Sequence, residues 1–173
     1  MDRDADTDTG TVSVMEIAAI TGRPEAGTRM KVFRYAAPDT LKRHRALVPL
    51  VKTQTLLSMV QIFGGGGGEQ EMHMHTAMDG FWFVLSGRAR FYGEGDVLVA
   101  DLGRHEGILV PAGAKYWFEA GDCERLELLQ VEAIDHRKKN EMVYYADRQP
   151  SVVAVYEPDG TIIAPSVRLG GGA

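Results

Sequence analysis

The chain has 173 residues, of which 45% are hydrophobic, and its 19 basic and 24 acidic residues give a formal net charge of -5. This length and apolar content predict one domain with a sizeable core. The acidic balance offers no basic surface for nucleic acid, no apolar run approaches the ~20 residues of a membrane helix, and the single Cys123 excludes an internal disulfide. Because neither a basic nor an apolar stretch near the N-terminus directs export, we expect a soluble, cytoplasmic protein.

The two ends of the chain are predicted to be poorly ordered. Residues 1–12 alternate aspartate with small or polar residues and have no apolar surface to bury, so we expect a disordered tail. Residues 169–173 contain three consecutive glycines and are expected to be flexible. Between them, residues 134–168 are predicted to form a C-terminal arm or hairpin, because Asp159-Gly160 separates two strand-like segments.

Residues 13–52 are predicted to form an N-terminal arm with a short helix. Apolar and charged residues alternate over Met30–Tyr35 in a strand-like way. The segment Asp39–Val48 begins with a plausible N-cap and stops before Pro49, which favours a short helix.

From Lys52 onward the chain consists of short segments rich in β-branched and aromatic residues, separated by Gly, Asp or Pro. Strands at this regular spacing predict an all-β antiparallel sandwich or barrel over residues 53–133. Five glycines at 64–68 lie between the first two strands. They favour a flexible hairpin connection over a phosphate-binding loop, because no Lys-Ser/Thr pair follows and no helix begins there.

His73 and His75 are two residues apart, just before the strand-like segment FWFVL. In extended backbone this spacing places both imidazoles on one face, and Glu71 shares that face. Two converging imidazoles are half of a metal site. The alternative is a pair of hydrogen-bonded interior histidines that hold no metal.

Residues Thr53 to Glu132 resemble the cupins, small β-barrel proteins with two motifs. The first motif is a glycine, an H-x-H pair, a glutamate and a second glycine; the second is a glycine, P-x-G and a later histidine. The matching residues here are Gly67 or Gly68, His73-Met74-His75 and Val84-Leu85-Ser86-Gly87 for the first motif, and Val110-Pro111-Ala112-Gly113 for the second. The resemblance implies a single cupin-type jelly-roll β-barrel and a homodimer.

Two of the family's four ligand positions hold other residues here. Gly80 stands at the glutamate position, directly after Asp79, and Tyr116 stands at the position of the second-motif histidine. We expect Asp79 to complete a site with the two histidines, brought inward by a one-residue bulge, with Glu71 as its substitute. A divalent transition metal is then expected, with iron(II) favoured over zinc, nickel or manganese.

An interior that mixes histidine, glutamate, tryptophan and tyrosine is unusual packing material for a small barrel and predicts a pocket. Tyr116 is the candidate catalytic residue, as a proton donor or acceptor; it can also ligate the metal or simply fill the barrel. The candidate substrate-binding residues are Trp82, Arg90, Phe118 and Gln130. Arg90 shares a face with Arg88 and would clamp a substrate carboxylate if that face is internal; otherwise both are solvated charges.

These features predict a metal-dependent enzyme that acts on a small aromatic or carboxylated metabolite. Oxygenase chemistry is the favoured reaction type, because an incomplete ligand set leaves coordination positions on the metal for substrate and O₂. The alternatives are a metal-dependent isomerase or lyase, and a small-molecule-binding cupin that has no catalytic activity.

Overall fold

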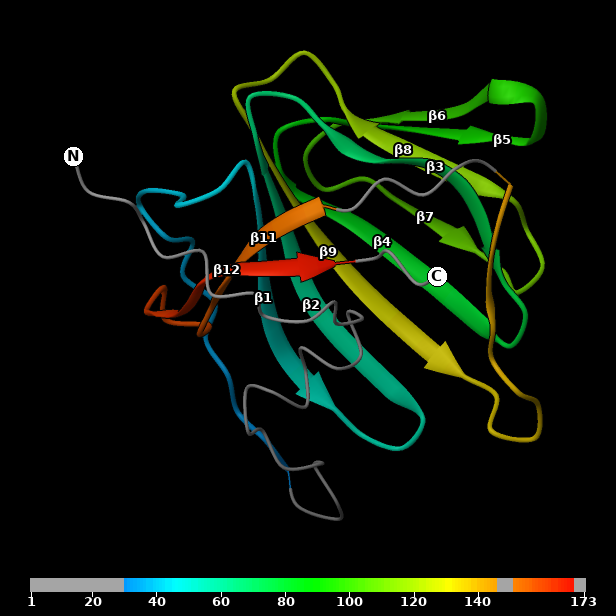
Figure 1. The fold of residues 1–173 in the computed structure, drawn as a ribbon, viewed down its shortest axis with the longest axis horizontal. Coiled ribbons are helices and arrows are strands. Elements are labelled where there is room, and N and C mark those ends of the chain that lie inside the picture. Colours follow the sequence, from blue (N-terminus) through cyan, green and yellow to red (C-terminus); the bar gives the residue numbers. More distant parts are fainter. Residues whose placement is uncertain (1–29, 146–150, 170–173) are drawn as a thin grey trace.

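The structure is a computed structural model that describes residues 30–145 and 151–169. Within these ranges the chain forms twelve strands and one short 3-10 helix, η1 (Figure 1). Their bounds are β1 (Arg45–Lys52), β2 (Leu56–Gly64), β3 (Gly68–His75), β4 (Met78–Ser86), β5 (Ala89–Gly93), η1 (Glu94–Asp96), β6 (Val97–Leu102), β7 (Gly107–Val110), β8 (Tyr116–Ala120), β9 (Arg125–Ile134), β10 (Met142–Tyr144), β11 (Ser151–Tyr156) and β12 (Ile162–Leu169). No helix in this part of the chain is long and apolar enough to cross a bilayer.

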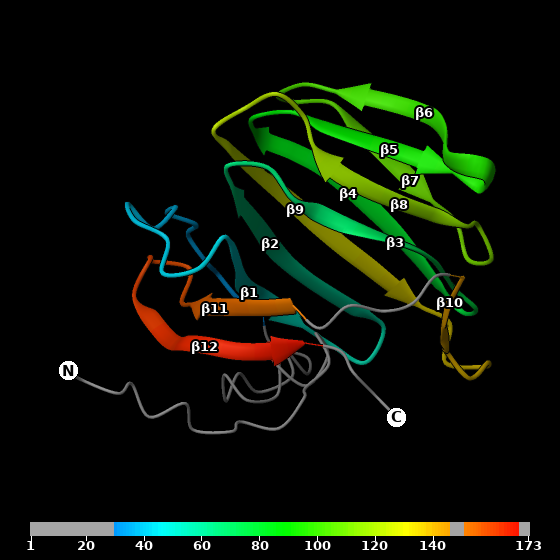
Figure 2. The same cartoon turned by 45° about the horizontal axis from the view of Figure 1, so that its top comes forward.

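The strands form two sheets that face each other (Figure 2). The large sheet has the order β12-β11-β1-β2-β9-β4-β7, and the small sheet has the order β10-β3-β8-β5-β6. Neighbouring strands are antiparallel except for β1 and β11, which are parallel. The predicted all-β jelly roll is confirmed, although the two sheets keep separate edges and do not close into one continuous barrel.

The core between the sheets follows from the alternation of side chains along each strand. In β4, Trp82 and Val84 are buried while Phe81 and Phe83 lie on the other face, as a two-residue period requires. The same period turns Tyr116 and Phe118 of β8 inward. The buried aromatic cluster between the two sheets is therefore assembled from alternate residues of several strands.

A second apolar cluster covers the inner face of the other end of the large sheet. It joins Leu47 of β1 and Met59 of β2 to Val153 and Val155 of β11. The two clusters are separated on that face by four polar side chains from β1, β2 and β9. These are Arg45, Gln61, Gln130 and Glu132, called the polar seam below.

The predicted helix over Asp39–Val48 is wrong, because β1 begins at Arg45. The strand is held between antiparallel β2 and parallel β11, and its central residues are buried. This pairing between distant segments overrides the local N-cap signal at Asp39. Pro49 lies at the irregularity where the register with β2 shifts between Pro49 and Val51, which is a position where proline is found in strands.

The N-terminal segment lies on the outer face of the large sheet. Met30–Tyr35 forms no strand, and Met30 is almost fully exposed. Tyr35 and Leu41 pack against the outward-facing apolar residues of β1 and β2. The Tyr35 hydroxyl donates to Glu127 of β9 over 2.8 Å.

The hairpin at Asp159-Gly160 and the glycine run at 64–68 have different places in the fold from those that the sequence predicts. The hairpin at Asp159-Gly160 is confirmed as β11–β12, with Gly160 at a φ of 88°, but it joins the large sheet through β1. The run of glycines at 64–68 leads from β2 in one sheet to β3 in the other, so it is a crossover and not a hairpin. Of the predicted tails 1–12 and 169–173, only Leu169 is among the described residues, and it is a buried residue of β12 and not part of a flexible tail.

Candidate functional site

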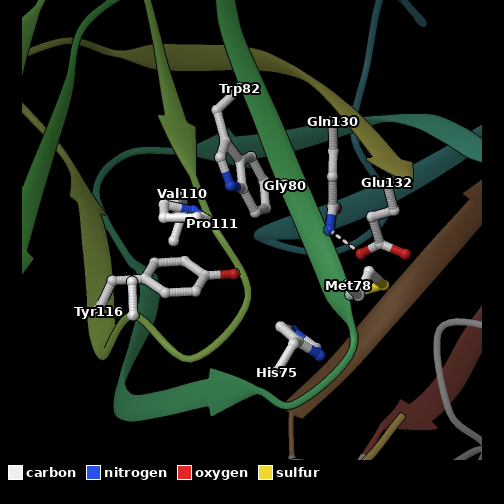
Figure 3. A pocket seen from close by; sticks show the side chains of 10 residues that line it. His75, Met78, Gly80, Trp82, Val110, Pro111, Tyr116, Gln130 and Glu132 are labelled. Carbon is white, nitrogen blue, oxygen red and sulfur yellow. Dashed lines mark hydrogen bonds between the residues drawn. The ribbon is translucent and has the colours of Figure 1, made fainter. Parts of the chain in front are cut away.

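A cavity lies between the two sheets and is lined by residues of β3, β4, β7, β8 and β9 and of the loop that joins β7 to β8 (Figure 3). Its polar lining residues are His75, Trp82, Tyr116, Gln130 and Glu132. Its volume is about 10 Å³, which is room for about one water molecule. The interior site therefore accepts one small functional group and not a whole metabolite.

The predicted pairing of the two histidines on one face of β3 is consistent with the structure. The rings of His73 and His75 are in edge contact, with centroids 5.5 Å apart. His73 Nδ1–H donates to the backbone carbonyl of Glu71 over 2.8 Å, which fixes the orientation of the ring. His75 lines the cavity, whereas His73 is 1% exposed and packs against the ring of Tyr116.

Tyr116 lies where β8 pairs with β3, directly opposite His73. Its ring centroid is 4.4 Å from that of His73 and 6.3 Å from that of Trp82. Figure 3 shows its hydroxyl directed into the cavity. The structure therefore brings together Tyr116 and both histidines, as the sequence predicts.

Gly80 lets the indole of Trp82 occupy the family's glutamate position. A Cβ atom at Gly80 would lie 3.1 Å from Trp82 Nε1, which is closer than ordinary contact. Trp82 itself is fully buried and lines the cavity. A glutamate at position 80 would need the space that the indole fills.

Glu132 is the carboxylate that sequence reasoning missed. It lies on β9 and is the Cα partner of Gly80 on β4, so it stands one strand away from the family's glutamate position. It lines the cavity and is only 5% exposed. It shares the buried face of β9 with Leu126, Leu128 and Gln130, and the mixed pattern of this strand does not indicate in the sequence which face is buried.

The hydrogen bonds of the polar seam all run in one direction, with each donor pointing toward Glu132. Arg45 Nη2 donates to Gln61 Oε1 over 2.6 Å, and Gln61 Nε2 donates to Gln130 Oε1 over 2.6 Å. Gln130 Nε2 then donates to Glu132 Oε1. Because arginine has no acceptor, its position fixes the orientation of both amides, and Glu132 is the acceptor at the end of the chain.

Asp79 does not reach the histidines. Its side chain is exposed, and its Oδ1 accepts the backbone N–H of Ala112 over 2.8 Å, which caps the turn after β7. The predicted bulge is absent at this point, because Asp79 keeps regular register with Ala133 and the register of β4 with β9 shifts only between Val84 and Ser86. The two-residue period therefore turns Asp79 away from the interior.

A complete metal centre is not assembled in the described part of the chain. No group of three His, Cys, Asp or Glu side chains there is placed to hold a metal ion. Glu71 is half-buried on β3 and supplies its backbone carbonyl to His73. The residues present thus offer two imidazoles without a third ligand, and they do not fit the family's metal site.

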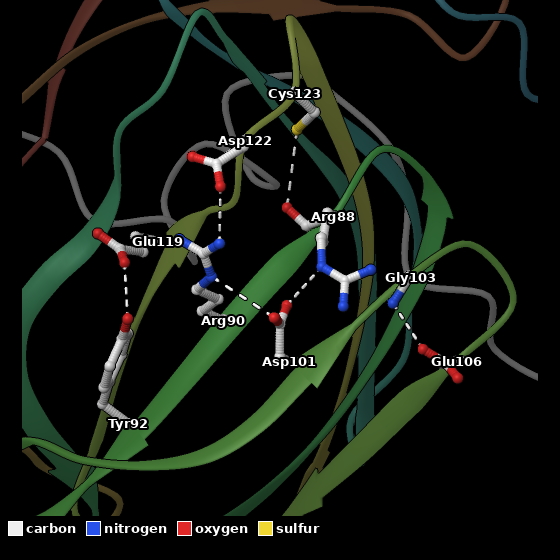
Figure 4. Close-up of polar contacts among 9 residues, drawn as sticks. All are labelled: Arg88, Arg90, Tyr92, Asp101, Gly103, Glu106, Glu119, Asp122 and Cys123. Atoms are coloured by element: carbon white, nitrogen blue, oxygen red, sulfur yellow. Dashed lines mark hydrogen bonds and ion pairs between the residues drawn. The ribbon is translucent and has the colours of Figure 1, made fainter.

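The predicted substrate-binding residues have three different locations. Trp82 and Gln130 line the cavity. Phe118 is fully buried in the aromatic core, stacked on Phe91, and does not line it. Arg90 lies on the outer face of the small sheet, where Nη2 bonds to Asp122 over 2.8 Å (Figure 4).

The predicted substrate clamp at Arg90 is therefore wrong. Arg90 and Arg88 share Asp101, with nitrogen–oxygen distances of 3.6 and 2.7 Å. The hydrogen bond from Arg88 lowers the pKa of Asp101. The alternation of β5 places these charges outside because Ala89 and Phe91 take the inward positions.

No family model matches the sequence. Mannose-1-phosphate guanylyltransferase of Escherichia coli (strain K12) is 27% identical over 139 residues, which are 78% of this chain and 26% of that protein. The ManC enzyme of Salmonella typhimurium matches to the same extent. The chain thus spans about a quarter of the length of these curated relatives.

Two solved structures are similar to this chain in fold. An uncharacterized conserved protein with a double-stranded β-helix domain from Klebsiella pneumoniae matches with a TM-score of 0.53 and 13% identity, over 69% of this chain and all of that one. The cupin domain of Cnp3 from Schizosaccharomyces pombe matches with a TM-score of 0.50 and 16% identity, over 61% of this chain and 71% of that one. The chain therefore has the cupin fold.

Proposed function

We propose that this cupin binds a small metabolite at the interior cavity and transfers a proton to or from it, as an isomerase or a lyase does. The observation that carries the proposal is that Glu132, His75 and Tyr116 line one buried cavity. A carboxylate, an imidazole and a phenol are the side chains that act as general acids and bases. Their placement in one water-poor site strengthens each electrostatic interaction with the reacting group.

Glu132 is the base in this proposal and Tyr116 is the acid. The polar seam ends on Glu132, whose carboxylate accepts a hydrogen bond from Gln130 and is held facing the cavity. Tyr116 directs a hydroxyl into the same cavity and can return a proton. His75 lines the cavity beside them and can support either transfer.

The size of the cavity determines how a metabolite would bind. One functional group enters the interior, and the rest of the molecule lies at the mouth, where Pro111 is exposed and Ala114 is half-buried. The reacting carbon is then held next to the inserted group. This arrangement suits removal of a proton from a carbon next to a carbonyl group, which takes up the electron pair as an enolate.

The test is hydrogen exchange between substrate and solvent. The protein is incubated in D₂O with EDTA and a panel of small hydroxy acids, keto acids and sugars, and C–H loss is followed by NMR. The panel includes mannose 1-phosphate because the guanylyltransferase relatives carry that substrate in their name. We expect one class to exchange, and Glu132→Gln and Tyr116→Phe each to slow that exchange by about 10²- to 10⁴-fold.

The matched control is Glu119→Gln. The Glu119 carboxylate lies outside the cavity and accepts a hydrogen bond from the Tyr92 hydroxyl. Exchange should be unchanged in this variant. Equal exchange in the wild type and in Glu132→Gln would overturn the acid–base proposal.

A metal-dependent oxygenase is the second candidate function, and the paired imidazoles of His73 and His75 favour it. It requires a third ligand that the described residues do not bring to them. Elemental analysis of untagged protein separates the two candidates. One equivalent of iron, lost in the His73→Ala/His75→Ala variant, would favour the oxygenase, whereas substoichiometric metal in both proteins is expected from the acid–base proposal.

A further inference from the structure

We infer that the outer face of the large sheet carries a second binding site, which takes a small organic anion, either a carboxylate or a phosphate ester, with an apolar body. The site is a pocket of about 480 Å³ that is lined by Tyr35, Leu85, Ser86, Arg104, His105 and Glu127. Pockets of this size hold small molecules in many proteins. The site is distinct from the interior cavity and does not depend on the proposed function.

The pocket lies on the side of β4 that faces away from the interior. Leu85 is on the outer face of β4, and Glu127 is on the outer face of β9. Tyr35 belongs to the N-terminal segment that packs on this face. Arg104 and His105 come from the turn between β6 and β7. Tertiary contacts between segments far apart in the sequence therefore assemble the pocket.

The first support for an anion is the guanidinium of Arg104. This side chain lines the pocket and forms no hydrogen bond or ion pair with any described residue. The nearby Arg88 and Arg90, by contrast, are both paired with Asp101. A guanidinium holds its N–H donors in a planar fork that matches two oxygens of a carboxylate or a phosphate. Arg104 thus keeps this fork for a ligand.

The carboxylate of Glu127 lines the same pocket but does not oppose an anion. Its Oε2 accepts the Tyr35 hydroxyl over 2.8 Å, and its Oε1 pairs with Arg125 Nε over 3.0 Å. Arg125 therefore offsets the charge of Glu127. Burial and the neighbouring Glu127 raise the pKa of Tyr35, so the phenol is neutral. These groups together leave the positive charge of Arg104 unopposed.

The second support is the backbone of His105. Its φ is 68°, in the left-handed region that a residue with a Cβ rarely adopts. The turn itself is closed by the Glu106 N–H, which donates to the Gly103 carbonyl over 3.1 Å. The His105 ring lies nearly parallel to the ring of Phe83, with centroids 6.4 Å apart. A histidine at a position that favours glycine, with its ring held at a pocket, indicates a role for the imidazole in binding.

The third support is an irregularity at the end of β4. Consecutive residues of a regular strand point to opposite faces, yet Leu85 and Ser86 both line the pocket. The register of β4 with β9 shifts between Val84 and Ser86, which is a bulge. Bulges are frequent beside binding sites because they redirect side chains. The bulge gives the ligand an apolar wall at Leu85 and a hydroxyl at Ser86.

The test is a ligand-observed NMR titration of the full chain with four probes that share a benzene ring. Benzoate and phenyl phosphate are anions, benzamide is a neutral analogue of benzoate, and benzylamine carries the opposite charge. A benzene ring does not fit the interior cavity of about 10 Å³, so these probes report on the outer pocket. We expect the anions to bind in a saturable way and benzamide at least about tenfold more weakly. The tighter of the two anions identifies the anionic group of the ligand.

Three variants locate the binding. Arg104→Gln should weaken the binding of the anions by at least about tenfold, because it removes the charged donors. His105→Gly should also weaken binding, while its midpoint of thermal unfolding should equal or exceed that of the wild type, since glycine adopts a positive φ freely. The control is Arg168→Gln, which changes an exposed arginine of β12, at the opposite edge of the large sheet from β7. This variant should bind as the wild type does.

Several outcomes would overturn the inference. Equal affinity for benzoate and benzamide, or tighter binding of benzylamine, would show that the pocket does not select anions. Anion binding that is unchanged in Arg104→Gln would place the anion elsewhere. If no probe saturates, the pocket is a solvated groove. A His105→Gly variant that binds normally and unfolds at a lower temperature would make His105 a structural residue of the turn. Deuterium exchange at the interior cavity is independent of all these results.

Discussion

The carboxylate of the candidate site comes from a neighbouring strand. Gly80 on β4 and Glu132 on β9 are Cα partners, and Glu132 is buried beside the cavity. The indole of Trp82 fills the space next to Gly80. A side chain at position 80 would press on the indole of Trp82 and would project from the position that pairs with Glu132.

The first prediction restores the family's residue. Gly80→Glu should lower the free energy of unfolding by about 2–4 kcal/mol, because it crowds Trp82 and places a second buried carboxylate beside Glu132. Urea unfolding provides the measurement. Gly103→Glu is the control, since the nearest atoms to a Cβ there are at 3.5 Å or more in an exposed loop. Unchanged stability of Gly80→Glu would show that the site is open at position 80.

The second prediction concerns the missing imidazole. Tyr116 is in ring contact with His73, so Tyr116→His places a third imidazole beside the existing pair. Three imidazoles match a common site for divalent transition metals. We expect Co²⁺ titration to give a saturable visible absorption in Tyr116→His. Tyr116→Phe is the control and should show no such band; equal bands in both variants would place the metal away from Tyr116.

At the scale of elements, the polar seam joins β1, β2 and β9 across the inner face of the large sheet. It lies between two apolar clusters, and Gln61 at its centre is fully buried. Arg45 also lies over the ring of Phe63, 5.3 Å from its centroid. A strand that the sequence assigns to an outer arm therefore supplies the charge at the start of a chain of hydrogen bonds that ends in the candidate site.

The third prediction separates this buried seam from the exposed ion pairs of the small sheet. Gln61→Leu removes hydrogen bonds to both Arg45 and Gln130 and leaves buried polar groups unsatisfied. We expect a loss of about 2–5 kcal/mol in the free energy of unfolding. Asp101→Asn, which breaks exposed pairs with Arg88 and Arg90, should cost no more than about 1 kcal/mol. Similar losses in the two variants, measured in urea, would mean that the seam does not act as a buried unit.

At the scale of the whole molecule, the C-terminal hairpin belongs to the large sheet. β11 pairs with β1 in parallel, and its inward valines pack against residues of β1 and β2. A parallel pair joins segments far apart in sequence, so the place of β11 in the large sheet depends on β1. The hairpin therefore extends the sheet and covers the second apolar cluster.

The fourth prediction tests that role with two adjacent residues. Val153 is fully buried and Val152 is exposed on the other face of β11. Val153→Asp should cost about 4 kcal/mol or more, or prevent folding, because it buries an unpaired charge. Val152→Asp should stay within about 1 kcal/mol of the wild type. Thermal unfolding of both variants is the measurement, and an equally stable Val153→Asp would show that β11 is only loosely attached.

The sequence by itself determined the features that depend on local periodicity. Alternation over two residues places His73 and His75 on one face and turns Trp82 and Tyr116 inward, and the order of H-x-H, VLSG and PAG indicates the cupin fold. These features need only extended backbone and short-range spacing. The fold class, most strands from β2 onward and the inward placement of Trp82 and Tyr116 could therefore be predicted from the sequence alone.

Only the tertiary structure decided which distant residues meet. The register of β4 with β9 turns Asp79 outward and sets Glu132 beside Gly80, and the pairing of β1 with β2 and β11 replaces the expected helix by a strand. Register depends on contacts between segments far apart in the chain, and a shift of one residue would reverse every face. The alternation within LELLQVE is the same whichever face is buried, so neighbouring strands alone select Gln130 and Glu132 for the interior.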